Sequence, residues 1–73
     1  MKLDAKDIGN RVKAIRLSEK KSQETFAEII DTSSRTVSNI ENGSVIPTLQ
    51  TVANIADCFN CSIDVIVRKE KQI

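Results

Sequence analysis

This chain of 73 residues is poor in several residue types: it has two glycines, one proline, two phenylalanines and no histidine, tryptophan or tyrosine. Its apolar runs are a few residues long, whereas a membrane-spanning helix needs about 20, and no charged-then-apolar secretion signal is recognised. We therefore expect a cytoplasmic location and no membrane partner. Because it lacks histidine, a glycine-rich phosphate loop and a nucleophile beside a base, we also predict that it is not an enzyme.

Cysteine is equally scarce, and its two copies form C-F-N-C at Cys58 and Cys61. A structural zinc site takes four ligands, and the chain has neither histidine nor a second cysteine pair. A redox-active pair opens a helix after a strand, whereas this pair closes a predicted helix. We expect Cys61 to be a small core residue and Cys58 to lie at a helix edge, with no metal, no cofactor and no small-molecule ligand.

The net charge is only +1, which argues weakly against a nucleic-acid partner. The charge is unevenly distributed, because residues 11–21 carry five basic residues against one acidic residue, whereas residues 22–43 carry one basic residue against four acidic ones. A basic first helix is able to place positive charge beside a phosphate strand. Since few phosphates would be neutralised, we expect non-specific affinity to be modest.

Apolar periodicity and capping residues predict an all-α chain with five helices and no strand. The expected helices cover residues 5–19, 23–30, 34–41, 49–58 and 63–67, and each follows a potential N-cap, namely Asp4, Ser22, Ser33, Thr48 and Ser62. The length allows a single domain, residues 1–73, with its core at about residues 5–67 and a polar tail at residues 68–73.

Each of the longer helices has one apolar face. In the second helix we expect the inward residues to be Phe26, Ala27, Ile29 and Ile30, and in the fourth Leu49, Val52, Ile55, Ala56 and Phe59. Leu17 falls nearly opposite the apolar stripe of the first helix, so we expect it to be exposed.

The third helix, residues 34–41, has the most informative polar face. At about 100° per residue, Val37 and Ile40 lie on one side, and the other side carries Ser34, Arg35, Ser38 and Asn39. Small polar side chains with one arginine suit the major groove of DNA, where arginine makes bidentate contacts with guanine and asparagine both donates and accepts. On the helical wheel alone, an ordinary solvated face is about equally compatible.

Five blocks of the sequence resemble the phage-repressor and Cro-type helix-turn-helix family, often called XRE-like. They are I-G-N-R-V-K-A-I-R (8–16), S-Q-E-T-F-A-E (22–28), S-S-R-T-V-S-N-I-E-N-G (33–43), P-T-L-Q-T-V-A-N-I-A (47–56) and S-I-D-V-I (62–66). The resemblance implies a compact, five-helix, lambda-repressor-like domain whose third helix reads the major groove. It also implies homodimers on palindromic half-sites about one helical turn apart.

The resemblance further implies roles for single residues. Base-reading positions of the family correspond to Ser34, Arg35, Ser38 and Asn39, and phosphate-contacting positions to Arg11, Gln23, Ser33, Asn42, Gly43 and Ser44. For Arg11, a solvated charge is an equally good interpretation. Arg16 and Glu41 correspond to an internal ion pair that ties the first helix to the end of the third.

Some positions depart from the family pattern. Asp31 stands where glycine is usual, and Lys20-Lys21 replaces a common glycine-apolar pair. Asp31 is able to adopt left-handed geometry, so we expect the turn to survive. Val65 is apolar where a polar residue is usual, and with Val67 and Ile73 it is a candidate for part of a dimer surface.

Two functions from different classes fit the sequence. The leading hypothesis is a sequence-specific, double-stranded DNA-binding transcriptional regulator, most simply a homodimeric repressor that occludes a promoter. The alternative is a protein-interaction or antitoxin-like adaptor that keeps the fold with weak or no DNA binding. The low net charge and the acidic second helix favour the alternative somewhat.

Overall fold

The computed structural model describes residues 3–68, and this segment folds into five helices without strands. They are α1 (Ala5–Ser18), α2 (Gln23–Ile29), α3 (Ser34–Glu41), α4 (Leu49–Cys58) and α5 (Ile63–Val67). The all-α prediction is confirmed, with each helix boundary within one residue of its expected place. The predicted tail lies outside the described residues except for Arg68, and Ile73 lies outside them too.

Every helix begins directly after the N-cap residue that the sequence predicted. Ser22 Oγ accepts a hydrogen bond from the Thr25 backbone N–H at 3.1 Å, and Ser33 Oγ accepts one from the Thr36 N–H at 3.1 Å. The other caps, Asp4, Thr48 and Ser62, accept in the same way. These bonds satisfy first-turn N–H groups that have no partner within the helix.

Helices α1 to α4 also end alike, with a left-handed residue directly after the C-cap. These residues are Lys20, Asp31, Gly43 and Asn60, with φ of 57°, 62°, 82° and 54°. The next residue donates back into the helix, as Thr32 N–H does to the Ala27 carbonyl at 2.9 Å. This is the Schellman arrangement, which closes a helix within one turn. The reversal at Asp31 lets α3 follow α2 almost immediately, as the sequence predicted.

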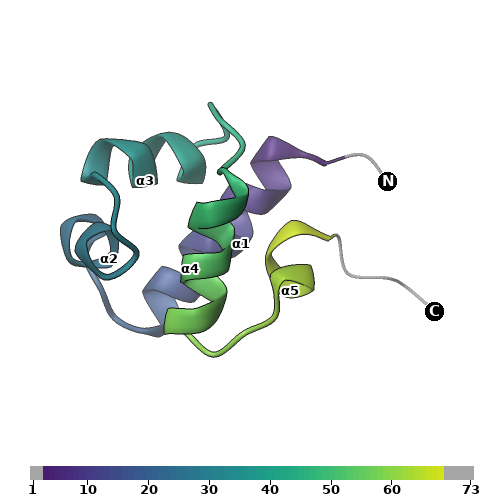
Figure 1. Cartoon of the computed structure of the whole chain (residues 1–73). Coiled ribbons are helices and arrows are strands. Elements are labelled where there is room, and N and C mark those ends of the chain that lie inside the picture. The colour runs from purple at the N-terminus through teal and green to yellow at the C-terminus, as the bar shows by residue number, and fades with distance from the viewer. Residues whose placement is uncertain (1–2, 69–73) are drawn as a thin grey trace.

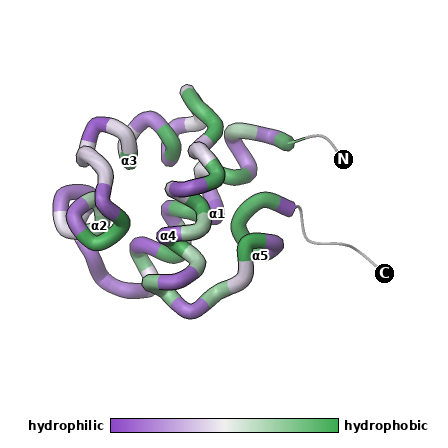
Figure 2. The backbone as a smooth tube through the Cα atoms, in the orientation of Figure 1, coloured by the Kyte–Doolittle hydropathy of each residue, from purple (hydrophilic) through white to green (hydrophobic). Residues whose placement is uncertain are grey.

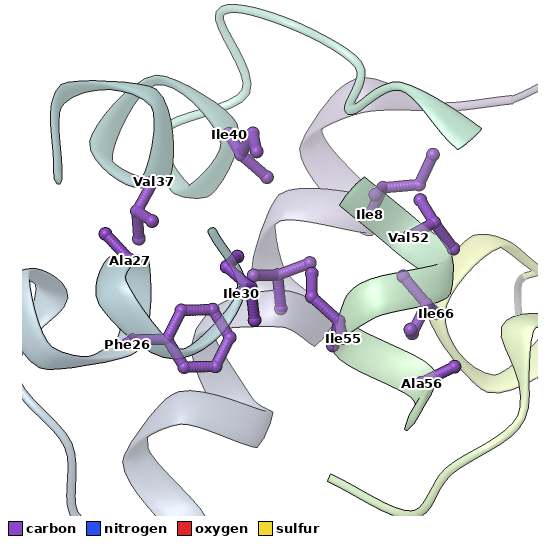
Figure 3. Packing of buried hydrophobic residues seen from close by; sticks show 11 residues of the cluster. Ile8, Phe26, Ala27, Ile30, Val37, Ile40, Val52, Ile55, Ala56 and Ile66 are labelled. Carbon is purple, nitrogen blue, oxygen red and sulfur yellow. The ribbon is translucent and has the colours of Figure 1, made fainter. Parts of the chain in front are cut away.

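The helices surround one core (Figures 1 and 3). Helix α3 packs against α1 and α2 at one end of the molecule, and α5 packs against α1 and α4 at the other. Ile8, Val12 and Ile55 are fully buried between these elements. The Phe26 and Phe59 rings stack with their centroids 5.0 Å apart. Within residues 3–68, no helix has the length and apolar composition required to cross a membrane.

Two of the predicted inward residues are exposed. Leu49 is 74% exposed because it is the first residue of α4, which starts beyond the edge of the core, and Val52 is the first residue of that helix to be buried. Ile29 is 39% exposed. At about 100° per residue it lies roughly 160° around α2 from Ala27, so the two cannot both face the core. Leu17 is exposed, as expected.

Candidate nucleic-acid interface

Helix α3 is anchored by two side chains and presents the rest of its surface outward. Val37 and Ile40 are buried and point from α3 towards α2 and the core (Figure 3). On the other side, Ser34 and Arg35 are exposed, while Ser38 and Asn39 are half-buried. We call this set of four residues the polar ridge. The structure therefore brings together the four side chains predicted to read bases, and leaves the guanidinium of Arg35 accessible.

Polar groups flank the ridge at both ends of α3. At the start, the exposed Ser33 hydroxyl caps the helix and also donates to Thr36 Oγ1 at 2.9 Å. At the end, Asn42 Oδ1 accepts from the Ser44 backbone N–H at 2.9 Å and from the Ser44 hydroxyl. Gly43, between them, passes close to α1, because a Cβ there would lie 3.3 Å from Lys6 Cα.

A buried ion pair joins α1 to the last residue of α3. Arg16 Nε donates to Glu41 Oε2 at 2.7 Å and Nη2 donates to Oε1 at 2.9 Å, with side chains only 10% and 4% exposed. Arg16 Nη1 also donates to the Lys21 carbonyl, at 2.9 Å, in the turn before α2. The hydrogen bond to Glu41 raises the pKa of Arg16, outweighing the opposite effect of burial. These are the two residues that the family resemblance pairs.

Sequence comparison identifies the family to which this arrangement belongs. Residues 12–66 match the family described as helix-turn-helix. The chain belongs to this family. No curated protein sequence matches it.

Solved structures of several other proteins share the fold. They include the restriction-modification controller protein C.AhdI from Aeromonas hydrophila (TM-score 0.80, 22% identity, covering 86% of this chain and 96% of that one). The P22 c2 repressor, crystallised with synthetic operator 9T, has a TM-score of 0.81 at 21% identity, with coverage of 86% and 96%. The clp gene regulator ClgR from C. glutamicum has a TM-score of 0.75 at 20% identity, with coverage of 89% and 86%. The chain thus shares its fold with this controller protein, this repressor and this gene regulator.

One residue at the start of the helix-turn-helix has a contact that the sequence did not reveal. Gln23, the first residue of α2 and predicted to contact phosphate, donates through Nε2 to Glu41 Oε1 at 3.1 Å. The two residues are 18 positions apart, so no periodicity connects them. The structure thus places the start of α2, the end of α3 and the last turn of α1 in one hydrogen-bonded group.

Gly9 is a second residue whose importance the sequence analysis missed. A Cβ at this position in α1 would lie 2.1 Å from the Ile40 carbonyl oxygen and 3.0 Å from that of Glu41. Only glycine lets the end of α3 approach α1 this closely. A glycine inside an otherwise periodic helix is the available signal for such close packing.

Arg11 lies in a different part of the molecule from its predicted companions. Its half-buried side chain donates from Nη1 to the Ile66 carbonyl, in α5, at 3.3 Å. This hydrogen bond joins α1 to the C-terminal end of α5, where a cation is stabilising. A guanidinium has five N–H donors, and this bond uses one of them.

The two cysteines lie where their sequence context indicated. Cys58 is exposed, at the end of α4, with its Sγ 3.6 Å from the Ile29 carbonyl oxygen. Cys61 is half-buried against the core, and burial raises the pKa of its thiol. Among residues 3–68, no group of three histidine, cysteine, aspartate or glutamate residues is arranged to hold a metal ion.

Proposed function

We propose that this helix-turn-helix protein is a sequence-specific regulator of transcription that inserts α3 into the major groove of double-stranded DNA. The observation that carries the proposal is the polar ridge, which lies on the side of α3 away from Val37 and Ile40. Two of its residues are exposed and two are half-buried. Arg35 supplies a bidentate donor for guanine, and Asn39 supplies both a donor and an acceptor. The serines at positions 34 and 38 are short enough to let the helix backbone approach the base edges.

The ion pair supports this function electrostatically. Glu41 ends the helix that would enter the groove, where a free carboxylate would be repelled by phosphates. Its bidentate contact with Arg16 neutralises that charge. At the other end of α3, the cap at Ser33 sets the start of the helix, whose first-turn N–H groups favour phosphate. The loop of Asn42, Gly43 and Ser44, at the end of α3, would contact another phosphate of the DNA backbone.

We further propose that the protein acts as a homodimer on a palindromic operator and represses by blocking a promoter. Two-fold pairing places two recognition helices about one helical turn apart. Figure 2 shows apolar residues along α5 and the connection after α3. Among them, Val65, Val45 and Ile46 are exposed, and such residues are suited to a contact between two copies. We assign Val65 to the dimer contact.

Selection of bound duplexes from a random pool tests the central proposal. We expect one preferred site with two-fold symmetry. In gel-shift titrations on that site, Arg35→Ala and Asn39→Ala should each cost roughly 1–3 kcal/mol and relax the preference at one base pair. Arg68→Ala is the control, because it removes the same charge from the far end of the molecule, where Arg68 pairs with Asp64.

Two results would contradict the proposal. Unchanged affinity and preference in both ridge variants would remove the base-reading assignment. A protein partner that covers the ridge, with DNA binding absent, would instead identify an adaptor, for which the low net charge of +1 is the supporting observation. Sedimentation with and without the selected duplex measures dimer formation, which Val65→Lys should weaken.

A further inference from the structure

The hydrogen bond between Gln23 and Glu41 links a predicted DNA contact to the buried ion pair. We infer that Glu41 is a positioning residue that holds the Gln23 side-chain amide ready for DNA, an inference that rests on the proposed function. Gln23 lies at the start of α2, and its side chain is half-buried. Its Nε2 donates to Glu41 Oε1 at 3.1 Å.

The chemistry of Glu41 determines which way the amide points. An ionised carboxylate only accepts hydrogen bonds, so the nitrogen of Gln23 faces Glu41 and the oxygen faces away. One of the two Nε2 hydrogens is then engaged. Among residues 3–68 this side chain has no other hydrogen bond, so a second donor hydrogen and the acceptor Oε1 are left for DNA. The free hydrogen alone is sufficient for a phosphate oxygen.

The carboxylate itself is held firmly enough to orient a neighbour. Its two oxygens accept from Arg16 Nε and Nη2, and the side chain is almost wholly buried. Ordering a side chain in advance avoids the loss of rotamer freedom on binding, which corresponds to about 2- to 12-fold in affinity for one residue. A glutamate at position 23 would instead face a second carboxylate, so the amide is specifically required.

A comparison of Gln23→Ala in two backgrounds tests the inference. The first background is the unmodified chain, and the second is Arg16→Met/Glu41→Met, in which apolar residues of similar size replace both charges. With the selected duplex at constant salt, we expect Gln23→Ala to weaken binding in both backgrounds. The loss should be about 2- to 12-fold greater in the first background than in the second, because only in the first is the side chain ordered in advance. Gln50→Ala is the matched control, because Gln50 is exposed and its amide donates to Asn54 Oδ1 within α4. This substitution should not change DNA affinity in either background.

The Gln23 amide resonances of the free protein give a readout independent of DNA. We expect one of the two Nε2 hydrogens to exchange slowly with solvent and to lose this protection in the second background. If circular dichroism shows that the second background is unfolded, Glu41→Asp replaces it. That variant keeps the charge beside Arg16 but retracts the carboxylate from Gln23, so the same loss of protection and reduced Gln23→Ala effect are expected.

The possible failures are distinguishable. Equal losses of affinity in the two backgrounds, or an unprotected amide in the unmodified protein, would overturn the positioning role while leaving DNA binding intact. Absence of specific binding by the unmodified protein would overturn the proposed function, and with it the DNA role of Gln23. If the unmodified protein does not bind DNA specifically but its Gln23 amide is protected, the role of Glu41 would be limited to holding α2 against α3.

Discussion

Substitution of Gly9 by alanine tests how closely α1 and α3 must pack. In an exposed helix interior this change stabilises by about 1 kcal/mol, because alanine has the higher helix propensity. Here the new Cβ would lie 2.1 Å from the Ile40 carbonyl oxygen, and real Cβ contacts essentially never fall below 3.0 Å. The same carbon would also lie 3.0 Å from the Glu41 carbonyl oxygen. Both obstacles are backbone atoms, so no rotamer change relieves them.

The helices must therefore separate by about 1 Å, and the structure indicates the cost. Overpacking a core typically costs 1–3 kcal/mol, and a clash with backbone belongs near the upper value. Subtracting the gain in helix propensity leaves a net loss of about 2 kcal/mol. For a domain of this size, that lowers the melting temperature by roughly 8–16 °C. The shift also moves Glu41 relative to Arg16 and displaces the polar ridge.

Thermal and urea unfolding followed by circular dichroism measure the effect. Asn10→Ala is the control, since Asn10 is exposed on the same helix and its replacement should stabilise by about 0.5 kcal/mol. Gly9→Ala should also weaken operator binding under conditions in which the variant is fully folded. If Gly9→Ala were as stabilising as Asn10→Ala, the close approach of α1 and α3 would not exist in solution.

Three further predictions concern the helix ends and the thiols. Lys20→Gly should raise the free energy of unfolding by about 1 kcal/mol and Asp31→Gly by about 0.5 kcal/mol, because both residues are left-handed and aspartate tolerates that geometry better; unchanged melting temperatures would contradict this. Gly43→Ala should lower stability by about 1 kcal/mol in the same unfolding assay, since φ is +82°. A thiolate-selective reagent should label Cys58 before Cys61, whose thiol has a raised pKa, and Cys61 should gain reactivity as pH rises; equal rates at neutral pH would contradict its burial.

Local signals predicted the helices well because their physics is local. Caps such as Ser22 and Ser33 act within three residues, and the turn at Asp31 depends on one backbone conformation. The burial of Val37 and Ile40 follows from helical periodicity alone. The exposure of Leu49 does not, because a helical wheel gives the direction of a side chain but not whether the core extends as far as that turn.

Contacts between distant residues were harder to predict. The partner of Gln23 is determined by how α2 and α3 meet, and the significance of Gly9 by how closely α1 approaches a carbonyl of α3. The contact of Gln23 leaves no pattern in a single sequence, and the only sequence signal for Gly9 is a glycine inside an otherwise periodic helix. The pairing of Arg16 with Glu41 was anticipated only through the family resemblance, which supplies three-dimensional information that periodicity lacks.

The buried ion pair is better explained by orientation than by stability. Apolar residues of similar volume often replace such a pair at no cost or with a gain in stability, so packing alone does not account for Arg16 and Glu41. Apolar contacts are non-directional, however, and would leave the angle between α1, the turn at Lys21 and the end of α3 less defined. The hydrogen bonds from one guanidinium to Glu41 and the Lys21 carbonyl fix that geometry, while Glu41 accepts a third donor from Gln23. A recognition helix needs this definition, because a small displacement of α3 moves every side chain of the polar ridge relative to the bases.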